Sequence, residues 1–358
     1  MYFRKIRLEA RHGSGDNWDE YPFFQTDKLR IHVEMDMSFA QQLAQASVAI
    51  YNLSVENAKA LTSGDTEVAS AGNAEATTKR KKVLIRIYAG YRDEELQSDT
   101  GLPLLLEGVV MNGSFRRALP HNVTQLYVLP LAAQFLRQTF APVPVRESIS
   151  ARDLVTAVLY RAGYEQNAIH FEGPEDFLSE AVSAGRTIDP GKDVYRYLHE
   201  LGTEFAFTFA LRPSGVGVYP LLDDSEAGHA DWNHLQERGE PYQVSPLLLK
   251  GAPSVGLCSI TLPMVFDARI FPGWVLDVRS LQGDRGDLSL PAGGVADYSA
   301  VGNPLFYTDD VAKYAVLPKY MALRVVHQID NYQDQWVTTV IGTVPTKGDT
   351  GKGEIRHG

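Results

Sequence analysis

The chain has 358 residues, of which 44% are hydrophobic and 22% are charged, a composition that excludes wholesale disorder. Its length allows two or three domains, each with its own core. No run approaches the roughly 20 apolar residues that a membrane-spanning helix needs, so membrane insertion is not expected. Cys258 is the only cysteine, which excludes an intrachain disulfide and a cysteine-based zinc site.

The formal net charge of −10 is unevenly distributed along the chain. Of the 44 acidic residues, 17 lie between positions 142 and 240, a stretch that holds only 8 of the 34 basic residues. A nucleic-acid-binding surface needs clustered Lys and Arg side chains, so the distribution argues against such a surface. It predicts a solvated, acidic middle segment instead.

The first third of the chain alternates apolar and polar residues in the manner of half-buried strands. The clearest case is 29–38, where the apolar side chains occupy one face and the charged ones the other. A short helix is expected after Ser54, which can cap it, and the small polar residues 62–78 predict a flexible loop. Strands are expected at 3–10, 29–38, 46–54, 81–91 and 102–117.

The middle of the chain has a different pattern, in which helices alternate with a hairpin. A helix is expected after Ser150 and should end at Gly163, and a second should start near Pro190 and end at Gly202. Strands are expected at 205–211 and 216–222, and 223–241 reads as a polar linker. The pattern predicts a small α+β domain.

The last third returns to strands, at 242–251, 257–270, 274–280 and in a hairpin at 320–344. Such spacing is typical of a barrel or a sandwich. A Gly- and Asp-rich loop covers 282–310, and the tail has no core-forming residues. The outer thirds also share a plan, since each has an apolar strand that leads through a polar loop into further strands.

His327 is the first candidate for chemistry, because it lies in the final hairpin among apolar residues. By the alternation of the strand it shares a face with Val325 and Ile329, whereas Asp330 falls on the opposite face. A catalytic histidine needs an orienting partner, and the sequence offers none. The pattern therefore favours a buried structural histidine.

The other candidates lie in polar loops, where solvated side chains are the simpler interpretation. His229 and His234 are five positions apart and so do not share a helix face, which argues against a metal site. Arg285 to Asp287 form a known adhesion tripeptide, but such a short match occurs by chance. Neither a phosphate-binding loop nor a nucleophile elbow is present. No catalytic, metal or cofactor site is therefore expected. Adjacent acidic pairs in such loops are likewise interpreted as solvated surface, and not as the two carboxyl groups that a glycosidase needs across a cleft. These pairs are Glu94 with Glu95, Glu175 with Asp176, Asp223 with Asp224, and Asp309 with Asp310.

Several stretches in order resemble the baseplate hub proteins of contractile-tailed bacteriophages, the family of the T4 hub and the tail protein D group. They are "ASVAIYNLS" with the helix "VENAKAL", then "KKVLIRIYAGY" with "LLLEGVVMNGSF". The helix "SISARDLVTAVLYRAGY" follows, and "DARIFPGWVLDVRS" with "ALRVVHQIDNYQDQWVTTVIGT" closes the series. The resemblance covers most of the chain by the order of its elements, but not the two long loops or the tail.

The resemblance implies a mainly β fold in which two tube-like β-barrel domains flank a smaller α+β domain. The expected division is 1–141 for the first barrel, 142–240 for the α+β domain and linker, 241–345 for the second barrel, and 346–358 for a mobile tail. Three such chains would present six barrels in a pseudo-hexameric ring.

The resemblance also implies partners. Expected are a homotrimer, the hexameric tail tube, the trimeric central spike, other baseplate proteins and a tape measure protein. DNA would pass through a central channel without sequence-specific binding, and no cofactor is implied. The chain would be made in the host cytoplasm and end in the tail of the virion.

Two other function classes stay open from the sequence. One is a peptidoglycan-degrading tail enzyme whose acidic side chains come together only in the fold, which the acidic middle segment suggests. The other is a receptor- or carbohydrate-binding module that uses loop aromatics such as Trp18 and Tyr21.

Overall fold

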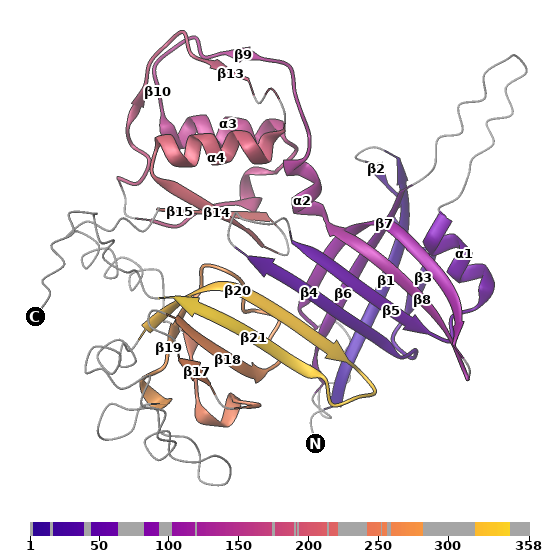
Figure 1. Cartoon of the computed structure of the whole chain (residues 1–358). Coiled ribbons are helices and arrows are strands. Elements are labelled where there is room, and N and C mark those ends of the chain that lie inside the picture. The colour runs from indigo at the N-terminus through magenta and orange to yellow at the C-terminus, as the bar shows by residue number, and fades with distance from the viewer. Residues whose placement is uncertain are drawn as a thin grey trace, which may run out of the picture.

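The structure is a computed structural model, and Figure 1 shows its arrangement. Two units built from strands lie side by side, and a unit with helices lies against both of them. The described residues are 3–14, 17–38, 44–63, 82–92, 102–118, 120–173, 176–189, 191, 193–212, 215–220, 242–251, 253–255, 259–281 and 319–343.

The N-terminal strand unit contains most of the strands predicted from alternation. In β4 the even positions face outward and the apolar odd positions are buried, as the sequence predicts. Its elements are β1 (Phe3–Ser14), β2 (Asn17–Trp18), β3 (Phe24–Thr26), β4 (Ile31–Ser38), β5 (Gln45–Tyr51), α1 (Val55–Ser63), β6 (Lys82–Arg92), β7 (Leu104–Ala118), β8 (His121–Pro130) and α2 (Leu131–Leu136).

Helix α1 begins where the sequence predicts, because the Ser54 hydroxyl accepts a hydrogen bond from the Asn57 backbone N–H at 3.2 Å. The helix packs closely on β7. A Cβ atom at Gly113 would lie only 2.7 Å from Thr62 Cγ2, so a glycine is needed at that point of the strand.

The middle unit has helices α3 and α4 packed on a small sheet. Ser150 caps α3 and Asp193 caps α4, each by accepting a hydrogen bond from a backbone N–H in the first turn. Its elements are β9 (Val143–Pro144), β10 (Ile149–Ser150), α3 (Ala151–Arg161), η2 (Gln166–Ala168), β11 (Ile169–Phe171), β12 (Ala181–Val182), β13 (Thr187–Ile188), α4 (Val194–Glu204), β14 (Phe207–Arg212) and β15 (Gly215–Pro220).

One helix end differs from its prediction. Gly163 directly follows the C-cap residue of α3 and has a φ of 107°, as expected of a glycine that ends a helix. Gly202, in contrast, lies inside α4, which continues to Glu204. Gly202 is needed there because a Cβ would lie 2.6 Å from the Phe207 carbonyl oxygen of the following strand. The glycine therefore allows close packing and does not end the helix.

The C-terminal strand unit holds the hairpin with His327. Its elements are β16 (Tyr242–Gln243), η3 (Pro246–Leu248), β17 (Ser254–Val255), β18 (Ser259–Val265), β19 (Val275–Asp277), η4 (Arg279–Leu281), β20 (Lys319–Asp330) and β21 (Trp336–Thr343). The fold is thus mainly β with helices in the middle unit, as the sequence predicts.

The two strand units repeat one plan. Their sheet orders are β4-β5-β8-β7-β6-β1 and β17-β18-β21-β20-β19-β16, so strands 1, 4, 5, 6, 7 and 8 correspond to strands 16 to 21 in chain order. The neighbouring strands of both units are antiparallel, with one exception. Strand β16 is parallel to β19, whereas its counterpart β1 is antiparallel to β6. The plan that the outer thirds share in the sequence is therefore a repeat of strand arrangement.

In each unit a short chain segment connects the two ends of the sheet. In the N-terminal unit, β3 pairs with β1 and the chain then runs directly into β4. In the C-terminal unit, β16 pairs with β19, and Leu249, Ser254 and Val255 then pair with β18. In each unit the chain thus connects the two ends of the sheet, and the apolar side chains are buried between the strands.

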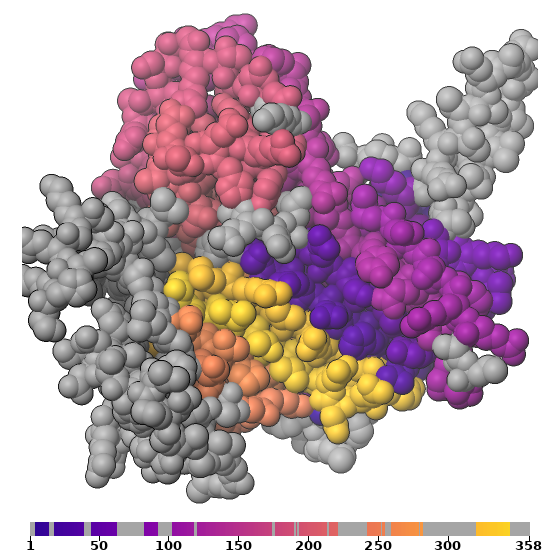
Figure 2. Space-filling model, viewed as in Figure 1, coloured from indigo at the N-terminus to yellow at the C-terminus, as the bar shows by residue number. Residues whose placement is uncertain are grey.

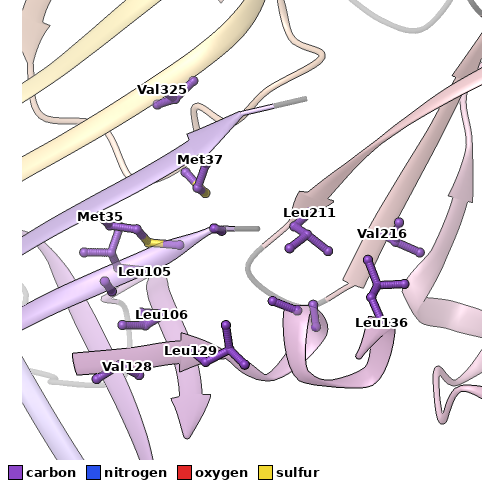
Figure 3. Packing of buried hydrophobic residues seen from close by; sticks show 14 of the residues in the cluster. Met35, Met37, Leu105, Leu106, Val128, Leu129, Leu136, Leu211, Val216 and Val325 are labelled. Atoms are coloured by element: carbon purple, nitrogen blue, oxygen red, sulfur yellow. The ribbon is translucent and has the colours of Figure 1, made fainter. Parts of the chain in front are cut away.

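The apolar core extends from the strands into the middle unit. Leu136 of α2 lies between Leu129 at the end of β8 and the middle sheet, and Figure 3 shows it near Val216 and Leu211. All of these side chains are nearly or completely buried. Helix α2 therefore joins the middle unit to the N-terminal strand unit.

Candidate functional site: the seam between the two strand units

The two strand units are joined by direct pairing of β4 with β20, and we call this junction the seam. Residues 324–330 of β20 pair in antiparallel register with residues 38–32 of β4, from Arg324 opposite Ser38 to Asp330 opposite His32. The earlier residues of β20, Lys319 to Met321, pair with β19 of their own unit. One strand therefore belongs to both units and makes their sheets continuous. In Figure 2 the yellow atoms of the C-terminal hairpin lie against the indigo atoms of the N-terminal unit.

The inner face of the seam is apolar. Met37 of β4 lies opposite Val325 of β20, and Val33 lies opposite Ile329. These side chains are 2% exposed or less. Separating the units would expose this surface to water, which costs roughly 25 cal/mol for each Å² of apolar area. The seam is therefore a packed junction of two cores.

His327 lies at the centre of this inner face and is fully buried. Its Nδ1 is 2.9 Å from the Thr338 hydroxyl, and its Nε2 is 3.2 Å from the Ile270 carbonyl oxygen. Since a carbonyl only accepts, Nε2 carries the proton, and Nδ1 accepts from the hydroxyl. The Thr338 oxygen in turn accepts from the backbone N–H of Asp267 at 3.1 Å. Both ring nitrogens are thus occupied.

Burial lowers the pKa of His327 from 6.5 to about 4, because a charged imidazole would lose its hydration. The Ile270 carbonyl and the more distant Asp267 carboxylate raise the pKa, but by less. A neutral ring with both nitrogens bonded and no exposed atom cannot exchange protons with a substrate at this position. The interpretation of His327 as a structural residue is consistent with this geometry.

Trp336 lies beside His327 and is also fully buried. Its ring meets Phe266 edge-on at 5.1 Å and Tyr91, at the end of β6, at 6.0 Å. The Arg4 guanidinium lies 6.0 Å from the centre of the same ring. Tyr91 and Arg4 belong to the N-terminal strand unit, so Trp336 is a second point of contact between the units.

The outer face of the seam is polar. Arg324 makes two hydrogen bonds to the Asp36 carboxylate, and the Gln328 amide donates to Glu34 at 3.2 Å. These pairs are partly exposed, so each contributes less than about 1 kcal/mol. They align the two strands more than they stabilise them, since a shift by one residue would separate each pair.

One end of the seam is fixed by a buried ion pair. Asp330 is 1% exposed, and its carboxylate accepts hydrogen bonds from Arg30 at 2.8 and 3.1 Å. It also accepts from the backbone N–H groups of Tyr332 and Gln333, at 2.9 and 3.1 Å. The Asp330 carboxylate therefore holds the turn of its own hairpin and the start of β4 together.

Asn331 completes this attachment. Its side-chain oxygen accepts from the Ile31 N–H at 2.8 Å, and its side-chain nitrogen donates to the Leu29 carbonyl at 2.8 Å. The amide thus continues the strand pairing by one residue beyond the end of β20. The seam ends in side-chain hydrogen bonds, not in a frayed strand.

A separate polar contact joins the middle unit to the C-terminal strand unit. Arg212 of β14 donates to Glu172 at 2.5 Å and lies 3.0 Å from the Tyr219 hydroxyl, which donates to the Pro272 carbonyl at 3.2 Å. Tyr219 is 2% exposed, and a Cβ at Gly273 would lie 2.4 Å from its ring. The middle unit is therefore held by specific contacts as well as by α2.

The remaining sequence candidates do not gather into a site. Tyr21 is 75% exposed, Trp18 is half-buried against Gly13, and Asp176 is exposed. The following candidates lie outside the described residues: Glu94, Glu95, Glu175, Asp223, Asp224, His229, His234, Cys258, Arg285 to Asp287, Asp309 and Asp310. Residues 62 and 63 of the predicted loop 62–78 belong to helix α1, and the rest of that loop, the loop 282–310 and the tail 346–358 lie outside the described residues.

Two further searches concern the part of the chain that the structure describes. Within it, no three His, Cys, Asp or Glu side chains are placed to share a metal ion. Among the helices described, none has the length and apolarity that crossing a membrane requires.

No protein-family model matches the chain, and no curated protein matches it either. Solved structures do resemble it in arrangement. A tail protein from Neisseria meningitidis MC58 has a TM-score of 0.49 at 9% identity, with 95% of this chain and 96% of that chain covered. A 43 kDa tail protein of prophage MuSo2 from Shewanella oneidensis has a TM-score of 0.46 at 7% identity, with 95% and 98% covered.

A third structure is an E. coli component of the type VI secretion system, described as similar to the T4 bacteriophage tail proteins gp27 and gp5. Its TM-score is 0.48 at 11% identity, over 88% of this chain and 73% of that one. All three TM-scores lie below 0.5, so the function is argued below from the chain itself.

The seam contains hydrogen bonds and an ion pair that could not be predicted in the sequence analysis. Thr338 lies directly opposite His327 in the hairpin, so a hairpin register would identify it as the partner of that histidine. The contact of Arg30 with Asp330 had no sequence signal, because the two residues are 300 positions apart.

Proposed function

We propose that the chain is a structural hub protein of a contractile phage tail. Three copies form a ring that joins the hexameric tail tube to the trimeric central spike and leaves a channel through which DNA passes. The ordered stretches of the sequence that resemble the hub family support this proposal. The protein acts by shape and by strand pairing, and catalysis has no part in it.

The observation that carries the proposal is the repeat of one strand plan within a single chain. The two strand units have corresponding strands in the same order, and the seam joins them edge to edge. A chain with two equivalent units can meet a sixfold partner with three copies, since each unit then occupies one of six similar positions. A threefold partner on the other side meets the same ring once per chain.

The proposed domain division follows the predicted boundaries, with strand domains at 1–141 and 241–345 around the α+β domain at 142–240. The tail tube and the spike are the proposed direct partners, and other baseplate proteins and the tape measure protein are the more distant ones. The virion tail is the proposed location, after synthesis in the host cytoplasm.

Native mass spectrometry of the purified chain, with negative-stain images of the same sample, tests this proposal. A mass of three chains and ring-shaped particles are expected. A stable monomer at micromolar concentration, without rings, would overturn it. Zymography on cell-wall material provides a second test, because lysis that a single Asp or Glu substitution abolishes would show an enzyme instead.

A further inference from the structure

The hairpins β7–β8 and β20–β21 correspond residue by residue. Each has one bulge in its first strand, between Val110 and Asn112 in β7 and between Ala322 and Arg324 in β20. Aligning the bulges places Phe115 at the position of His327. The residues opposite them then also coincide, because Phe115 faces Thr124 and His327 faces Thr338.

The two hairpins differ in what lies beyond the bulge. In β20 the residues after the bulge pair with β4, on the edge that β19 has left free. In β7 the pairing with β6 stops at Val109, and residues 110–118 have no strand partner on that edge among the described residues. Among the described residues, this part of β7 therefore has no strand partner on the edge where its counterpart is covered, and helix α1 packs against the strand at Gly113.

Exposure follows this difference. Phe115 is 40% exposed, whereas His327 is fully buried, and Met111 of the bulge is 58% exposed. Large apolar side chains next to an unpaired strand edge mark a surface that another chain can cover. This part of β7 thus combines an edge without a strand partner among the described residues and exposed apolar side chains, as β20 would without β4.

The counterpart of β4 in the C-terminal unit is the segment from Leu249 to Val255, of which the structure describes 249–251 and 253–255. Strand β5 pairs with β8 as β18 pairs with β21, so β5 corresponds to β18. Ile50 takes the position of Met264 in this alignment, because Ile50 faces Thr124 and Met264 faces Thr338. Ile31 pairs with Ile50 in the N-terminal unit, and Leu249 pairs with Met264 in the C-terminal unit. The segment therefore occupies the place of β4.

The other end of the segment agrees. Met35 of β4 pairs with Ala46, and Val255 pairs with Ile260, which is the residue that corresponds to Ala46. The segment is less regular than β4, since named strand pairing covers only Ser254–Val255. On its outer edge no strand partner is found among the described residues.

We propose that residues 115–117 of β7 pair antiparallel with residues 253–255 of a second copy of this chain, as β20 pairs with β4 within the chain. The number of copies, three, rests on the proposed function, whereas the choice of edges rests on the repeat. The register of the seam places Phe115 opposite Val255 of the second copy and Arg116 opposite Ser254 of the second copy. Repeating the contact closes a ring of six strand units.

Two cysteines at the inferred junction test the pairing directly. In a chain with Cys258→Ser, the pair Arg116→Cys and Ser254→Cys should form disulfides between copies on mild oxidation, because opposed residues of paired strands lie within disulfide range. A non-reducing gel should then show dimers and trimers that reduction converts to monomers.

Two further pairs serve as controls in the same background. Glu34→Cys with Gln328→Cys lies directly across the seam and should form a disulfide within one chain, without a ladder. Arg116→Cys with Tyr160→Cys keeps one junction position and moves the other to an exposed site on α3, so it should give no ladder.

The variant Phe115→Lys gives a second readout, by placing a charge at the inferred junction. It should lower the trimer fraction in native mass spectrometry at least tenfold, whereas Tyr160→Lys leaves it unchanged. If the wild-type chain forms trimers but the junction pair gives no ladder and Phe115→Lys stays trimeric, the inference is wrong and the proposed function stands. If the wild-type chain stays monomeric and the junction pair gives no ladder, both are wrong.

Discussion

The hairpins β7–β8 and β20–β21 have the same form but different surroundings. In β20–β21 a strand from the other unit covers the edge, and the position at the centre holds a buried histidine bonded to Thr338. In β7–β8 the matching position holds a half-exposed phenylalanine, and the buried Thr124 hydroxyl has no hydrogen-bond partner among the described residues. The neighbouring strand, more than the hairpin itself, therefore decides which side chains form a core.

Trp336→Ala is the change that should weaken the covered hairpin most. The ring is fully buried between Phe266 and Tyr91, so its removal leaves a cavity and costs up to about 5 kcal/mol of unfolding free energy. Urea unfolding followed by circular dichroism measures the loss. Tyr21→Ala removes an aromatic ring that is 75% exposed and should leave the unfolding midpoint unchanged. Equal effects of the two variants would show that Trp336 is not an anchor.

Asp330→Ala should have the next largest effect, because it leaves the Arg30 guanidinium and two turn N–H groups without their acceptor. Removing the buried partner should cost about 3 kcal/mol, the lower end of the range for buried ion pairs, because Arg30 is 23% exposed and stays partly hydrated. Asp334→Ala, four residues further in the same turn, removes a fully exposed carboxylate and should not change stability measurably. A drop in stability as small as that of the control would place the attachment of the turn elsewhere.

Acid should weaken the covered hairpin through His327. The unfolded chain takes up a proton near pH 6.5 and the folded chain only near pH 4, so the unfolded state binds more protons between these values. The stability that the neutral ring contributes is complete above pH 6.5 and falls by about 3 kcal/mol as the pH drops to 4.

Urea midpoints measured from pH 7 to pH 4 test this dependence, with His327→Gln as the comparison. Glutamine keeps a donor and an acceptor, so folding and assembly should stay largely intact in that variant, while this part of the acid dependence disappears. An unchanged pH profile in His327→Gln would mean that other groups cause the loss.

Arg324→Ala should have the smallest effect. Its ion pair with Asp36 lies on the outer face of the seam with both side chains more than a third exposed, so the loss should stay below about 1 kcal/mol. High salt should reduce the difference between variant and wild type further. A loss as large as that of Asp330→Ala would mean that both faces of the seam stabilise it equally.

Much of the fold could be predicted from the sequence because strand alternation and helix caps are local signals. The strict alternation of β4 and the Ser150 cap of α3 are examples. The seam could not be predicted, since nothing in residues 30–38 specifies a partner 300 positions away. Asp330 shows the limit most clearly, because alternation places it correctly on the outer face and yet Arg30 and the turn bury it.

The sequence separation across the seam also affects how the chain is made. At roughly 5–20 residues per second, a ribosome needs about 15 to 60 seconds between the synthesis of β4 and that of β20. Through that interval β4 has a regular outer edge and no β20 to cover it. Nascent chains on the same message could pair through that edge before the native strand emerges. Slow completion of the final hairpin is therefore the step at which this protein is most exposed to misassembly.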